Sequence, residues 1–159
     1  MFDVVRGKTL WLVDVPREQA LWTPPGTSNS ILWHAGHALC VVERLTLTAL
    51  EGRDDEPPAL PRGWWDLFGW DSTPATTPAA VWPELAAVVE QLREQPARLG
   101  TVLAGLAQAT LDEPLHLPDY PWHGYSKRFI LLHGIHDEAC HGGEIWLLRK
   151  LYERCEPAA

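Results

Sequence analysis

The sequence has few basic residues, few cysteines and no long apolar run, and each shortage excludes a class of protein. It has 13 Lys and Arg against 21 Asp and Glu, and the formal net charge of −8 opposes binding to nucleic acid. No stretch approaches the roughly 18 apolar residues that a membrane span needs. Asp3 and Arg6 interrupt any signal-peptide core. We therefore expect a cytoplasmic protein that binds neither a membrane nor nucleic acid.

The three cysteines, Cys40, Cys140 and Cys155, are odd in number and lack C-x-x-C spacing. Free thiols in a reducing compartment fit this pattern better than a disulfide framework does. Apolar residues make up 46% of the 159 residues, which is enough for a core in one domain covering residues 1–159.

Apolar periodicity predicts an all-α protein with four helices, over about residues 2–14, 31–51, 77–106 and 126–154. Residues 27–30 are rich in N-cap types, and Gly52 suits the C-cap of the second helix. Pro96 is expected to kink or split the third helix. The intervening linker, residues 53–77, is long enough to span the bundle, which permits an up-down-down-up arrangement.

The linker also carries an aromatic cluster: Trp64, Trp65, Phe68 and Trp70. Tryptophan buries a large area with one polar handle, so the cluster is expected either to cap the bundle or to line a pocket mouth.

Histidines gather on the second and fourth predicted helices, beside carboxylates. Asp137 and His141 are one turn apart and share a face, whereas His136 points roughly 140° away from His141. A third ligand must come from another helix, and the second helix offers His34 or His37. Two imidazoles and one carboxylate leave a coordination position open, which is typical of catalytic sites. Zinc suits these ligands, iron fits them too, and nickel and manganese remain compatible.

A reading without metal is also consistent with the spacing. In that reading His34 and His37 pack beside Trp33, and Asp137 with Glu138 forms a solvated acidic step.

Two short motifs resemble the DinB/YfiT superfamily of metal-binding helical bundles. Residues 30–37, S-I-L-W-H-A-G-H, resemble its second-helix segment, and residues 141–145, H-G-G-E-I, resemble its H-x-G-[Q/E]-I. The resemblance implies an up-down-down-up four-helix bundle, commonly a homodimer, with a divalent metal bound by His37 and His141.

Asp137 departs from the family pattern, in which a histidine usually lies four residues before the last ligand. Relatives resembling mycothiol-dependent enzymes carry a carboxylate there, so we expect Asp137 to bind the metal. His133, where many members carry an extra histidine, is a candidate fourth ligand or partner of a ligand. Glu144 is expected to orient a ligand, to act as a catalytic base, or to pair with a surface cation. We expect Cys140 to be a packed thiol rather than a nucleophile.

Three functions fit these features. The first, implied by the resemblance, is a metal-dependent thiol S-transferase that uses a low-molecular-weight thiol on small electrophiles. The second is a metal-dependent hydrolase with Glu144 as base. The third is a non-enzymatic metal-binding protein of the stress response.

Overall fold

The computed structural model describes residues 1–53, 59–117 and 121–155. Every regular element in these ranges is a helix, apart from an isolated bridge between Pro114 and Ser126. The helices are α1 (Phe2–Leu12), α2 (Arg17–Leu21), α3 (Ile31–Cys40), α4 (Trp64–Phe68), α5 (Leu85–Gly105) and α6 (Lys127–Cys155), with a π-helix η1 (Val41–Thr48) continuing α3 and 3₁₀ turns at Pro74–Thr76, Ala79–Val81 and Gln108–Asp112. The protein is therefore all-α, as the sequence predicts.

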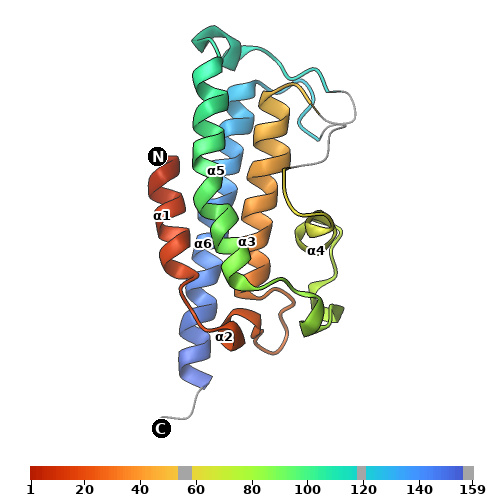
Figure 1. Ribbon diagram of the computed structural model, residues 1–159, viewed down its shortest axis with the longest axis vertical. Coiled ribbons are helices and arrows are strands. Elements are labelled where there is room, and N and C mark those ends of the chain that lie inside the picture. Colours follow the sequence, from red (N-terminus) through yellow and green to blue (C-terminus); the bar gives the residue numbers. More distant parts are fainter. Residues whose placement is uncertain (54–58, 118–120, 156–159) are drawn as a thin grey trace.

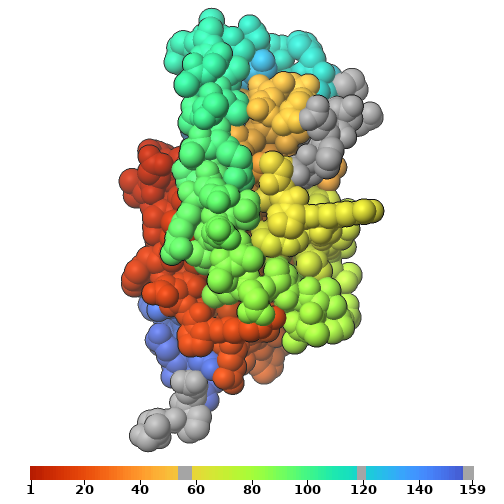
Figure 2. All heavy atoms as spheres, in the orientation of Figure 1, coloured from red at the N-terminus to blue at the C-terminus, as the bar shows by residue number. Residues whose placement is uncertain are grey.

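The long helices lie side by side, with α3 and α5 running in one direction and α1 and α6 in the other (Figure 1). Residues 59–81 return along the outside of α3, which allows α3 and α5 to be parallel (Figure 1). Figure 2 shows α5 over the front of this view, flanked by α1 on one side and by residues 59–81 on the other, with α2 below its lower end. The helix α3 packs on α6, and this contact brings the histidine-bearing helices together.

The start of the third long helix differs from the prediction. The helix α5 begins at Leu85 rather than near residue 77, and 3₁₀ turns precede it. Pro83 disfavours helical backbone at the preceding residue, and Trp82 is extended with φ −67° and ψ 137°. Pro83, which lies within the predicted span, therefore moves the start of the helix towards the C-terminus.

Pro96 does not split α5, which continues from Leu85 to Gly105. Proline has no N–H to donate to the carbonyl four residues earlier, so Leu92 loses its usual helical partner. The Arg6 side chain replaces it, because Nη1 donates to the Leu92 carbonyl over 2.6 Å. A side chain from α1 thus satisfies the polar group that the proline leaves free.

Arg6 also joins a buried polar network that the sequence analysis missed. It is 2% exposed and pairs with the fully buried Glu138 of α6 through contacts of 2.7 and 2.9 Å. Arg6 donates to Gln95 of α5, and Gln95 donates to Glu43 of the π-helix over 2.7 Å. The network links the long helices, and the reading of Glu138 as a solvated acidic residue is wrong.

The aromatic linker cluster divides between core and surface. Trp64 and Phe68 are buried in the main core, whereas Trp70 is exposed. A Cβ at Gly36 of α3 would lie only 2.3 Å from the Phe68 ring, so this glycine allows α4 to approach α3 closely. The close approach anchors the linker beside the second histidine of α3.

No helix in the described part of the chain is both long enough and apolar enough to cross a bilayer.

Candidate metal centre

The helix α3 places both of its histidines in the interior. Ser30 caps this helix, because its side chain accepts a hydrogen bond from the backbone N–H of Trp33 over 3.2 Å. His34 is 6% exposed and His37 is 3% exposed. The His37 ring stacks on Trp33, with 4.6 Å between ring centroids. The His34 ring meets Trp33 edge-on, with 5.2 Å between ring centroids, so both histidines pack beside Trp33 as the reading without metal expects.

The carbonyl of Phe68, at the end of α4, fixes the orientation of His37. It lies 2.6 Å from Nδ1 of His37. A carbonyl oxygen only accepts, so Nδ1 carries the proton and donates it, and Nε2 keeps its lone pair. A backbone carbonyl on the second ring nitrogen is a usual companion of metal-binding histidines.

The helix α6 contributes Asp137 and His141, one turn apart on one face. Oδ2 of Asp137 lies 3.6 Å from Nε2 of His141, too far for a hydrogen bond. That oxygen is buried and has no hydrogen-bond partner. An orphaned buried carboxylate oxygen costs free energy, and a cation beside it removes that cost.

His37, Asp137 and His141 form one group of candidate ligands, with the three donor atoms all within 4.8 Å of one another. Donor atoms around a tetrahedral zinc ion lie about 3.3 Å apart, given bonds near 2.0–2.1 Å. The 3.6 Å between Oδ2 of Asp137 and Nε2 of His141 is close to this donor-to-donor distance. The three donors therefore suit a divalent cation in type, and the separation of Asp137 from His141 matches the spacing around one.

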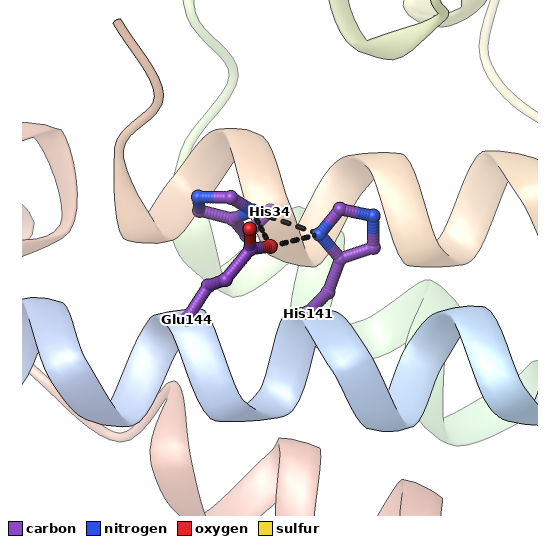
Figure 3. A group of neighbouring side chains, drawn as sticks. All are labelled: His34, His141 and Glu144. Atoms are coloured by element: carbon purple, nitrogen blue, oxygen red, sulfur yellow. Dashed lines mark hydrogen bonds and ion pairs between the residues drawn. The ribbon is translucent and has the colours of Figure 1, made fainter. Parts of the chain in front are cut away.

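A second group, His34, His141 and Glu144, lies on the Nδ1 side of His141 (Figure 3). Oε2 of Glu144 is 2.7 Å from Nδ1 of His141 and 3.0 Å from Nδ1 of His34. The two Nδ1 atoms are 2.9 Å apart. The two groups share His141, which presents a different ring nitrogen to each.

The buried histidines favour their neutral forms. Burial, followed by the nearby His141 and His37, lowers the pKa of His34 to about 3. Burial also lowers the pKa of His37, although the Phe68 carbonyl opposes this shift. A neutral imidazole is the form that binds a metal.

Other residues named from the sequence lie apart from these two groups. The His133 ring packs against Trp122, with ring centroids 4.9 Å apart, and against Phe129. Cys140 is exposed, so the expectation of a packed thiol is wrong. Its Sγ lies 3.8 Å from Nε2 of His136, on the outer side of α6.

The Phe68 carbonyl is the site feature that sequence reasoning missed, since any residue type supplies such a group. The signal available was indirect: Gly36 is a glycine inside a helix, one residue before the candidate ligand His37. A glycine in a helix interior often marks the close approach of another segment.

A family model described as the DinB superfamily matches residues 1–145 of the chain. This match covers most of the chain, including α3 and the part of α6 that carries Asp137 and His141, so the chain belongs to that superfamily. No curated protein matches the chain significantly.

Proposed function

We propose that this member of the DinB superfamily holds one divalent cation between His37 of α3 and Asp137 and His141 of α6. The observation that carries the proposal is the orphaned Oδ2 of Asp137, buried 3.6 Å from Nε2 of His141. His37 completes the set, because its other nitrogen is already committed to the Phe68 carbonyl. Two imidazoles and one carboxylate suit zinc best, and they also suit iron, nickel or manganese.

We infer that the site serves a thiol S-transferase that acts on small electrophiles. A bound divalent cation lowers the pKa of a thiol or water that it coordinates. Three protein donors leave room for one small ligand, as in catalytic rather than structural zinc sites. The side chains of Asp137 and His141 are 22% and 13% exposed, so the candidate ligands of α6 lie close to solvent although Oδ2 itself is buried.

In this proposal the residues of the chain bind the cation and keep its ligands in a fixed orientation. His37 is held by α4, so its donor nitrogen keeps one direction. Trp33 covers the His37 ring and contacts His141 edge-on, which excludes water from the apolar side of the site. The substrates that fit are a low-molecular-weight thiol and a small electrophile.

We also infer that the helices form an up-down-down-up four-helix bundle, with the linker as the crossover. The parallel directions of α3 and α5 support this topology (Figure 1).

Cobalt(II) titration of the metal-free protein tests the proposed site. One equivalent per chain is expected in the wild type, with loss of binding in His37→Ala and Asp137→Ala. Adding a small thiol then shifts the cobalt absorption, because the thiol enters the open position. A cobalt spectrum that thiols leave unchanged means a closed site, which favours a non-enzymatic metal-binding role.

A further inference from the structure

Glu144 lies on the edge of the His141 ring that faces away from Asp137. Its Oε2 is 2.7 Å from Nδ1 of His141, whereas the nitrogen near Asp137 is Nε2. The same oxygen is 3.0 Å from Nδ1 of His34, which comes from α3 (Figure 3). One carboxylate oxygen therefore links the two histidines, one from each helix.

Three short separations hold this cluster together, and the two that join Glu144 to the histidines are those of hydrogen bonds. The three separations are 2.7, 2.9 and 3.0 Å, all shorter than the roughly 3.3 Å between donors of a tetrahedral zinc ion. Both N···O contacts fall within the ordinary hydrogen-bond range. Glu144 thus joins the two histidines through hydrogen bonds to both Nδ1 atoms, and the 2.9 Å between these two atoms is a close contact between donors that share one acceptor.

The chemistry of the carboxylate decides where the protons are. An ionised carboxylate oxygen only accepts, so each Nδ1 that contacts it carries the hydrogen. His141 then has its lone pair on Nε2, the nitrogen beside Asp137. This is the tautomer that a ligand at that position requires.

We propose that Glu144 and His34 are positioning residues that fix the tautomer and the ring orientation of His141. The proposal rests on the proposed cation site, and it places Glu144 in a role other than that of a catalytic base. His34 supports the carboxylate from α3, because its own ring is 6% exposed and has little freedom to move.

The surroundings of Glu144 agree with this role. Its side chain is 53% exposed, so its hydrogen bonds hold it in place rather than burial. Glu144 and His34 line a cavity of about 370 Å³ with residues 27–29 and two leucines of α6. His37 and Asp137 do not line that cavity, so a base at Glu144 would face a space apart from these two candidate ligands.

Nitrogen-15 NMR of the histidines in the metal-free protein tests the positioning role without any cation. His141 of the wild type is expected as the Nδ1–H tautomer. In Glu144→Ala the two tautomers of His141 are expected to mix, because the acceptor at Nδ1 is gone. Glu153→Gln, on the same helix and exposed, is the matched control and should leave His141 unchanged.

Cobalt titration supplies the second readout. Glu144→Ala is expected to weaken binding by about 10–100-fold while one equivalent per chain is retained. Glu144→Gln keeps an acceptor oxygen, so its cobalt affinity should fall less than that of Glu144→Ala. A similar loss is expected in His34→Ala.

Two results overturn the inference. The first is a His141 tautomer and a cobalt affinity that Glu144→Ala leaves unchanged. The second is binding of two equivalents of cobalt by the wild type and of one by Glu144→Ala. That result would make the cluster of His34, His141 and Glu144 a cation site itself. If the wild type binds no cobalt but the tautomer still depends on Glu144, the proposed function fails and the hydrogen-bonded cluster stands.

Discussion

Replacing Gly36 by alanine tests whether the close approach of α4 to α3 supports the site. The added Cβ would lie 2.3 Å from two carbons of the Phe68 ring, where unstrained carbon contacts are about 3.5–4.0 Å. The ring is fully buried and packs against Trp64 and Trp82, with ring centroids 5.8 and 5.5 Å away, so it cannot move without disturbing them. Overpacking of this kind costs about 1–3 kcal/mol, and the better helix propensity of alanine returns up to about 1 kcal/mol.

We therefore expect Gly36→Ala to lower the free energy of unfolding by about 2 kcal/mol in urea denaturation. Cobalt affinity should fall about 10–100-fold, because movement of Phe68 takes its carbonyl away from His37. Gly100→Ala on α5 is the matched control, since a Cβ there meets nothing within 4 Å. The control should be more stable than the wild type by about 0.5–1 kcal/mol. Equal stability and equal cobalt affinity in the two variants would refute the reasoning.

Three further predictions concern other parts of the chain. Arg6→Leu should lower the free energy of unfolding by about 3–5 kcal/mol, because it leaves Glu138 buried and unpaired, and the double variant with Glu138→Leu should recover part of this loss. Iodoacetamide at pH 8 should modify Cys140 quickly and Cys40 only after unfolding, because Cys40 is buried in the main core and burial raises its pKa to about 12; rapid labelling of Cys40 in the folded protein contradicts this burial. His133→Ala should leave cobalt affinity within about twofold of the wild type, because its ring packs on Trp122, and a tenfold loss would make His133 a ligand.

Helical periodicity predicted the parts of this site that depend on one helix at a time. Asp137 and His141 share a face because they are one turn apart, and the structure brings His37 to them. The sequence left His34 and His37 as alternatives for one position. The structure gives them different neighbours, since His37 contacts Phe68 and His34 contacts Glu144.

Features that depend on contacts between distant segments were not predictable in this way. The pairing of Arg6 with Glu138 joins residues 132 positions apart, and an isolated glutamate beside an aspartate reads as a surface residue. The π-helix Val41–Thr48 replaces part of a predicted α-helix, although its sequence has ordinary helical spacing. Gln95 donates to the Leu39 carbonyl just before these turns, a contact that exists only once α3 and α5 have packed.

Anomalous X-ray diffraction at the zinc edge, from crystals of the zinc-loaded protein, tests the central claim most directly. The claim predicts one peak per chain, within about 2.0–2.2 Å of Nε2 of His37, Oδ2 of Asp137 and Nε2 of His141. A peak between His34, Glu144 and Nδ1 of His141, or the absence of any peak at these residues, would contradict it.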